Sequence, residues 1–333
     1  MPNSLPALPL PFSAPAAPHA AHHQLIVPYA ALLDDSCQHV LSQLALPNLQ
    51  QLLQRLSPSH TDTAQQEHPV PPHERVCARI VGMNSDAPAW AALQTGMADT
   101  PCAWLTPCHW SAGADQVRMD DPTTLQLDMA DAQALLAVLA PWFTEDGLQL
   151  EVVTPMLWRV SGAALAQLQA ASLDRVLLRD VTPWLPSAAH CRTLHRLHSE
   201  VQMLLYTHAL NTQRAEQGRL PMNAFWLHGA GMLSSHSLQQ AQAQSQQHHV
   251  VIADGLRQTA LRQDWPAWKA AWLAADAGPV AEVLRHVQQG GSASVHLCGE
   301  HHARSWHTQP RSWLSRVQQA LRPQRFADWH QAL

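Results

Sequence analysis

The order of hydrophobic and polar residues predicts both helices and strands in the first half of the chain. Apolar residues at helical spacing mark a leucine-rich region that ends near residue 56 and a helix at 130–143. Short apolar runs predict strands at 76–83, 102–110, 148–155 and 156–162, and a polar loop with prolines is predicted at 57–74. This order is typical of an α+β layer, with helices on one face of a mostly antiparallel sheet.

Strands and helices alternate in the second half. Buried strands are predicted at 223–229, 250–255 and 293–300, with helical patterns between the last two and a helix at 310–323. Such alternation predicts a partly parallel sheet. The expected fold class is therefore α/β of the mixed α+β kind, a mixed sheet with flanking helices. We expect a disordered tail at 1–23, an N-terminal α+β region at 24–186 and a C-terminal α/β region at 187–333, and the two regions are compatible with packing as one domain.

Composition narrows the class of protein. The chain has 333 residues, 46% of them hydrophobic, and a net charge of -5, so we expect no nucleic-acid partner. Apolar runs are broken by proline or charge before about 18 residues, so we expect no membrane span. The first 23 residues hold no lysine or arginine, which argues against a signal peptide. Six cysteines without a CxxC pair favour reduced thiols, and we predict a cytoplasmic protein.

Histidine clusters invite metal hypotheses. Cys191, His195 and His198 would share one face of a helix, and His301 and His302 follow a predicted strand. Against this, the chain contains 22 histidines, so clusters arise without function. We interpret the first group as exposed polar residues on a packing helix, and we expect neither a metal nor another cofactor.

Sequence motifs of known catalytic sites are missing. The sequence contains no GxSxG, no GxGxxG, no Walker phosphate loop and no HExxH. We therefore lean against an enzyme.

The strongest candidate pocket lies between residues 211 and 231. Asn211 and Arg214 are predicted in a turn, and a buried strand follows and ends in a glycine-rich loop. Arginine and exposed backbone N–H groups together suit an anion. The alternative is structural, with asparagines tying down turns and glycines permitting positive φ. The candidate ligand-binding residues are Asn211, Arg214, Asn223, His228, Gly229 and Gly231.

The same stretch carries two resemblances. LNTQRAEQGRLPMNAFWLHGAG (210–231) resembles a segment of the archaeal-type, cofactor-independent phosphoglycerate mutases, with the pattern N-x-x-R-x-x-x-G-x-x-P-x-N, an apolar run and a G-x-G turn. A longer region, from about residue 100 to residue 231, resembles bacterial RpfE-type regulatory proteins through CAWLTPCHW, TPMLWRV, SEVQMLLYTHALN and PMNAFWLHGAG. The mutase resemblance implies a metal-dependent phosphotransferase with an alkaline-phosphatase-like fold.

Mutase activity also implies an Asp-Gly metal motif near the start of the chain, a serine nucleophile and later Asp and His ligands. Here the Asp-Gly pairs stand at 146–147 and 254–255. We therefore expect a regulatory or small-ligand-binding protein without mutase catalysis, whose partner is an anionic small molecule or a protein. The competing expectations are a divergent metal-dependent phosphomutase or phosphatase and a structural interaction protein.

Overall fold

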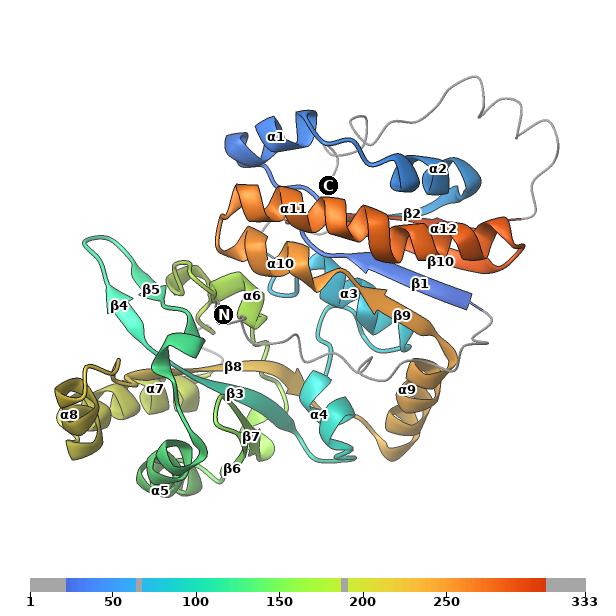
Figure 1. Ribbon diagram of the computed structural model, residues 1–333. Helices are drawn as coiled ribbons and strands as arrows, with labels where there is room; N and C mark the ends of the chain where they lie inside the picture. The colour runs from blue at the N-terminus through green and yellow to red at the C-terminus, as the bar shows by residue number, and fades with distance from the viewer. Residues whose placement is uncertain (1–21, 64–67, 187–190, 310–333) are drawn as a thin grey trace. The chain divides into compact units, whose positions relative to one another are not determined.

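A computed structural model describes residues 22–63, 68–186 and 191–309, which fall into two compact units (Figure 1). The central unit is Gly82–Gln242. The split unit consists of the described residues up to Val81 and from Ala243 onward. The boundary expected between residues 186 and 187 lies within the central unit.

The central unit combines helices with two antiparallel sheets. Its α-helices are α4 (Trp90–Thr95), α5 (Met129–Glu145), α6 (Leu173–Val176), α7 (Arg192–Tyr206), α8 (Ala209–Glu216) and α9 (Ser235–Gln247, which continues into the split unit), and its 3-10 helices are η1 (Pro122–Leu125), η2 (Ala163–Leu165) and η3 (Thr182–Trp184). Its strands are β3 (Cys102–Cys108), β4 (Trp110–Ala112), β5 (Val117–Met119), β6 (Gln149–Thr154), β7 (Leu157–Ser161) and β8 (Ala224–Gly231).

The main sheet of the central unit has the strand order β6-β7-β3-β8, and each neighbouring pair is antiparallel. Every residue of β3 is buried. Helices α5 and α7 supply apolar side chains at helical spacing to the same core, including Leu135, Leu139, Leu197 and Val201. An Asp128–Asp131 capping box fixes the start of α5. The predicted antiparallel α+β layer is confirmed, with β8 as an additional strand from later in the chain.

The split unit is built from both ends of the described chain. Its strands are β1 (His22–Val27), β2 (Ser57–Thr63), β9 (His249–Ile252), β10 (Ser292–Cys298) and β11 (His302–His307). Its helices are α1 (Asp35–Ser42), α2 (Pro47–Arg55), α3 (Pro72–Ile80), α10 (Asp254–Leu261), α11 (Trp265–Ala275), the π-helix η4 (Asp276–Val280) and α12 (Ala281–Gln288).

The sheet of the split unit is mixed, with the order β2-β11-β10-β1-β9. Strand β1 is parallel to both of its neighbours, whereas β10 with β11 and β11 with β2 are antiparallel. The predicted partly parallel sheet and the predicted mixed α/β class are confirmed. Strand β1, which lies between β10 and β9, comes from the first part of the described chain, so the parallel pairs join residues more than 220 positions apart (for example Leu25 with Val251).

Three local predictions are wrong and two lie partly or wholly outside the described residues. Residues 76–80, predicted as a strand, belong to helix α3, and residues 57–63 of the predicted loop form strand β2. Helix α3 begins with polar residues, of which His73 and Glu74 fall within the predicted loop, and the apolar run that follows is short enough for a strand. The predicted tail ends earlier than expected, because residues 22 and 23 already begin β1. Residues 1–21 and the predicted helix at 310–323 lie outside the described part of the chain.

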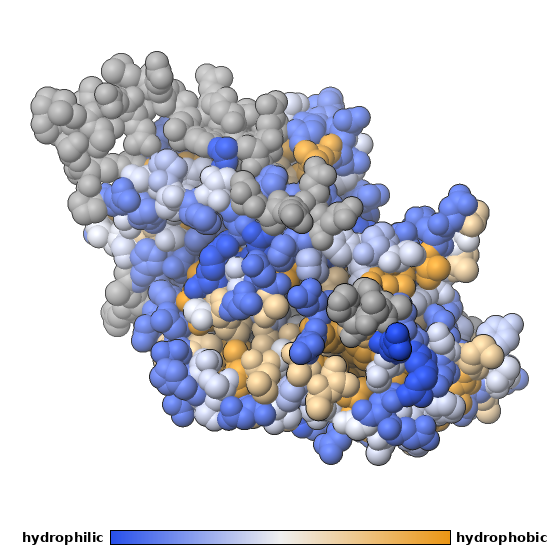
Figure 2. Space-filling view, turned by 180° about the vertical axis from the view of Figure 1, so that it is seen from behind, coloured by the Kyte–Doolittle hydropathy of each residue, from blue (hydrophilic) through white to orange (hydrophobic). Residues whose placement is uncertain are grey.

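The described surface exposes apolar side chains mostly one at a time. The large exposed ones are Leu33, Met129, Val153, Met203, Tyr206, Met232 and Leu273. On the face shown in Figure 2, hydrophilic and hydrophobic areas are interleaved. Scattered apolar residues of this kind are ordinary on a folded surface. Within the described ranges, no helix has the length and hydrophobicity needed to cross a membrane.

Candidate functional site

Arg214 is the predicted site residue with the most partners. It lies on helix α8, within what was predicted as a turn, and only 4% of its surface is exposed. Its Nε and Nη2 donate to the Leu220 carbonyl at 3.1 and 3.0 Å, and Nη2 also donates to the Leu125 carbonyl. Nη1 donates to Asp131 Oδ2 at 3.0 Å. Arg214 therefore ties the loop after α8 to the residues that precede and begin α5.

Asn211 has a purely internal set of hydrogen bonds. Its Nδ2 donates to the Leu205 carbonyl at 2.9 Å and to the Met222 carbonyl at 2.6 Å. Its Oδ1 accepts from the Met222 N–H at 3.1 Å. The side chain thus joins the end of α7 to the chain entering β8. All five polar groups of these three hydrogen bonds are satisfied where water is excluded, which is how buried amides stabilise a fold.

Asn223 connects the start of β8 to the beginning of β4. Its Oδ1 accepts from the Trp110 N–H at 2.7 Å, and its Nδ2 donates to the Trp110 carbonyl at 2.9 Å. The amide thereby pairs with both polar groups of one backbone residue, as a neighbouring strand would. Asn223 therefore holds a backbone segment in place, which is the structural alternative that the sequence left open.

His228, Gly229 and Gly231 lie inside strand β8, so the glycine-rich loop predicted after the strand is wrong. His228 Nε2 is 3.0 Å from the Thr106 hydroxyl, and both side chains are buried. A Cβ added to Gly231, whose φ is +155°, would lie 2.7 Å from Ala89 Cβ. A Cβ on Gly229, whose φ is +59°, would lie 3.0 Å from Trp90 Cβ. The glycines therefore let the start of α4 pack against β8.

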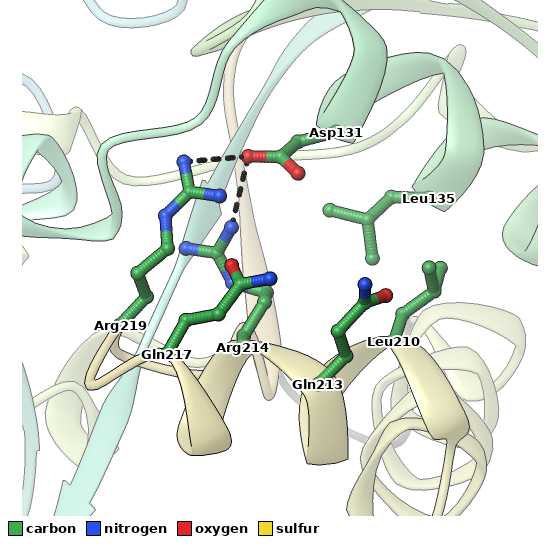
Figure 3. Close-up of a pocket in the computed structure, with 7 residues that line it drawn as sticks. All are labelled: Asp131, Leu135, Leu210, Gln213, Arg214, Gln217 and Arg219. Carbon is green, nitrogen blue, oxygen red and sulfur yellow. Dashed lines mark hydrogen bonds and ion pairs between the residues drawn. The ribbon is translucent and has the colours of Figure 1, made fainter.

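One recess of the central unit includes a predicted site residue. It has a volume of about 120 Å³ and lies between α5 and α8, as Figure 3 shows. Its lining consists of Asp131, Leu135, Leu210, Gln213, Arg214, Gln217 and Arg219. Of the six predicted residues, the structure brings Arg214 to this recess and places the other five in the packing contacts described above.

Two guanidinium groups converge on one carboxylate at the edge of the recess. Asp131 Oδ2 is 3.0 Å from Arg214 Nη1 and 2.9 Å from Arg219 Nη2. The Arg214 pKa is lowered because burial disfavours its charge, and the neighbouring Arg219 acts in the same direction, whereas Asp131 opposes both. The residues that line the recess thus carry two positive groups and one negative group, and the carboxylate of Asp128, outside this lining, also acts on Arg214.

Asp131 and Arg219 were missed by reasoning from the sequence. Asp131 is the third residue of α5 and accepts a capping-box hydrogen bond from the Asp128 N–H. The Asp-x-x-Asp spacing before the apolar run at 130–143 could have identified this helix start. Nothing in the sequence links it to Arg214, 83 residues later.

The cluster at Cys191, His195 and His198 does not form the exposed face that we predicted. His195 Nε2 is hydrogen-bonded to the Pro186 carbonyl. The His198 ring is stacked between Phe225, at a centroid distance of 4.2 Å, and Trp110, at 5.3 Å. Burial lowers the His198 pKa to about 4. Within the described residues, no group of three or more His, Cys, Asp or Glu side chains is arranged to hold a metal ion.

A serine–histidine–amide array in the split unit also escaped prediction. His296 Nδ1 is 2.7 Å from Ser305 Oγ, and His296 Nε2 is 2.9 Å from Gln24 Oε1. Because the amide oxygen can only accept, Nε2 carries the proton and Nδ1 accepts from the serine. Burial and the nearby Arg79 charge lower the His296 pKa to about 3. So weak a base does not activate a hydroxyl near neutral pH, and the array acts as a buried polar link between strands.

Comparison with known proteins gives limited information. A scan against protein-family models and a search of curated proteins found no match. Among solved structures, the chain is similar to the cofactor-independent phosphoglycerate mutase from Thermoplasma acidophilum, with 13% identity, a TM-score of 0.35, and coverage of 90% of this chain and 94% of that one. It is also similar to the PH0037 protein from Pyrococcus horikoshii, with 11% identity, a TM-score of 0.39, and coverage of 86% and 87%. At these TM-scores, functional inference rests on the side chains of this chain.

Proposed function

We propose that this chain is a regulatory protein that binds a small phosphate-like anion in the recess between α5 and α8. The observation that carries the proposal is the charge of the lining residues, with the guanidinium groups of Arg214 and Arg219 converging on the carboxylate of Asp131. The resemblance of the region around residues 100–231 to RpfE-type regulatory proteins supports a regulatory role. The six free cysteines support a reducing, cytoplasmic setting.

The two arginines have different roles in this proposal. Arg214 is held by three hydrogen bonds to the carbonyl groups of Leu220 and Leu125, so its positive charge has a fixed position in the lining of the recess. Arg219 has a side chain that is 28% exposed, and its Nη2 contacts the Gln126 carbonyl and Asp131. An incoming anion would compete with Asp131 for Arg219, whose side chain can move without disturbing the core.

The size and lining of the recess suit a compact anion. A volume of about 120 Å³ corresponds to roughly four water molecules at about 30 Å³ each. A tetrahedral oxyanion with one bridging water needs comparable space. Gln213 of α8 and Gln217, which directly follows this helix, offer amide donors at the recess, so phosphate oxygens would find donors beyond the two guanidinium groups (Figure 3).

Binding of inorganic phosphate and of 3-phosphoglycerate tests the proposal, measured by thermal shift and isothermal titration calorimetry. We expect at least one of the two to stabilise the wild-type protein, by about 2.7 kcal/mol at a concentration of 100 Kd. Arg219→Gln should weaken binding at least tenfold, because it removes a charge-assisted contact while leaving the core intact. Arg192→Gln is the matched control, since Arg192 is an exposed arginine at the start of α7.

Three results would contradict the proposal. The first would be that neither anion binds the wild-type protein, and the second that Arg219→Gln binds the anion as tightly as Arg192→Gln does. Turnover of 3-phosphoglycerate with a bound divalent metal would instead identify an enzyme, and elemental analysis of the purified protein accompanies the assay for that reason.

A further inference from the structure

Half-buried histidines gather at one end of the sheet of the split unit. Strand β11 runs antiparallel to β10, so the last residue of β11 lies at the same end of the sheet as the first residues of β1, β9 and β10. This histidine cluster consists of His22 and His23 of β1, His248 and His249 at the start of β9, His286 of α12 and His307 of β11.

The rings of the cluster are in direct contact. His23 stacks on His286 with ring centroids 3.8 Å apart and planes 12° from parallel, and it lies 4.6 Å from the ring of its strand partner His249. His22 lies 6.3 Å from His248. A Cβ on Gly291 would lie 2.2 Å from His286 Nε2, so the missing side chain there leaves room for the His286 ring.

The groups that act on these histidines are other histidines. Burial, followed by the neighbouring His286, His249 and His22, lowers the pKa of His23 to about 4. Burial also lowers the pKa of His22, with contributions from His248, His307 and His286. The hydrogen bonds of His22 and His307 are made with uncharged partners.

Two serines and one amide supply those neutral contacts. Ser292 and Ser294 of β10 place their hydroxyls 2.9 Å from the two ring nitrogens of His22. The Gln309 amide lies 2.7 Å from His307 Nε2. On α12 the charged residues near His286 are Arg285, its neighbour, and Glu282, one helical turn earlier, and both are exposed to solvent.

We propose that the histidine cluster is an acid-sensitive clasp, which holds the starts of β1 and β9 against α12 while its rings are neutral and releases them when the rings gain protons. Neutral imidazoles stack with little repulsion, whereas two adjacent imidazolium ions repel each other. A metal site fits the contacts less well. The lone pairs of imidazole lie in the ring plane, so rings stacked face to face do not aim them at one point between them.

The direction of the pH response follows from proton linkage. In the closed clasp His23 stays neutral until the pH approaches 4, whereas in an opened segment it protonates near its ordinary pKa of 6.5. The open form therefore binds more protons between these values. Its population rises as the pH falls from about 6.5 to about 4, and the closed form is fully favoured above that window.

Hydrogen exchange followed by mass spectrometry tests the clasp on the full chain. After correction for intrinsic exchange rates, we expect amides of β1 and β9 to open about tenfold more often at pH 5 than at pH 7. His23→Gln should flatten this dependence, because it removes the stacked, titrating ring. His39→Gln is the matched control, since it removes an exposed histidine of α1 in the same unit and should leave the dependence unchanged.

Further measurements keep the proposal open to refutation if His23→Gln does not fold. Gly291→Ala should displace the His286 ring and weaken the pH dependence without altering a histidine. In the wild-type protein, a ring titration of His23 by NMR with a pKa near 6.5 would overturn the proposal. Exchange in β1 and β9 that is equal at both pH values would overturn it as well. Protection of the same segments by added Zn²⁺ at pH 7 would assign the cluster to metal binding instead.

Discussion

Acidification should destabilise the central unit through His198. The ring lies between Phe225 and Trp110, its Nδ1 is shielded from solvent without a hydrogen-bond partner, and burial lowers its pKa to about 4. In the unfolded chain the same imidazole titrates near 6.5. The unfolded state therefore binds more protons between these values, and stability is lost as the pH falls from 6.5 to 4.

The size of this effect follows from the same two values. A pKa difference of about 2.5 corresponds to at most about 3 kcal/mol below pH 4, at 1.36 kcal/mol for each pKa unit. Between pH 7 and pH 5 the His198 contribution to the free energy of unfolding should fall by about 2 kcal/mol. Replacement by phenylalanine keeps an aromatic ring in the stack and removes the titrating group.

Urea unfolding at pH 7 and pH 5 measures this contribution. His198→Phe should lose about 2 kcal/mol less than the wild-type protein over that interval. His236→Gln is the control, because His236 is exposed on α9 and its loss should not change the pH dependence. A His198 ring that titrates near 6.5 by NMR, or equal pH dependence of the wild type and His198→Phe, would show that the stacked ring is not held neutral by its surroundings.

Three further substitutions have expected effects that thermal and urea unfolding can measure. Gly231→Ala should destabilise the protein by about 2 kcal/mol or more, since the added Cβ would lie 2.7 Å from Ala89 Cβ. The control Gly218→Ala meets nothing within 4 Å and should cost only about 1 kcal/mol of backbone strain at φ +68°. Equal losses of stability in the two variants would contradict the packing role of Gly231. Asn211→Ala should destabilise by about 2–3 kcal/mol because it leaves a buried N–H and two carbonyls without their partner, and a loss below about 0.5 kcal/mol would show that water replaces the amide. Asp131→Asn should lower stability by about 1–2 kcal/mol, yet bind inorganic phosphate more tightly by calorimetry, because it removes the negative charge that competes for the arginines; weaker binding would place the anion elsewhere.

Local sequence patterns identified the elements whose apolar residues have a clear spacing or a clear start and end. Helix α5 repeats apolar residues at helical spacing over 130–143, and strand β3 is a short apolar run flanked by turn residues, so both were predictable. Helix α3 was not, because its polar first turn falls within the predicted loop and the apolar run from Val76 onward is short enough for a strand. The pairing of β1 with β9 and β10 could not be predicted either, since no local sequence pattern indicates which distant strand pairs with β1.

The candidate site shows the same division between local and long-range information. The sequence alone determined the mixed α/β class and pointed to Arg214 as a charged residue shortly before a buried strand. Only the tertiary structure decided that Asn211, Asn223 and the glycines of β8 serve packing and backbone tie-down, and that Arg214 meets Arg219 and Asp131. The physical reason is that periodicity depends on neighbours within a few residues, whereas a recess is made by charges that folding brings together from distant positions.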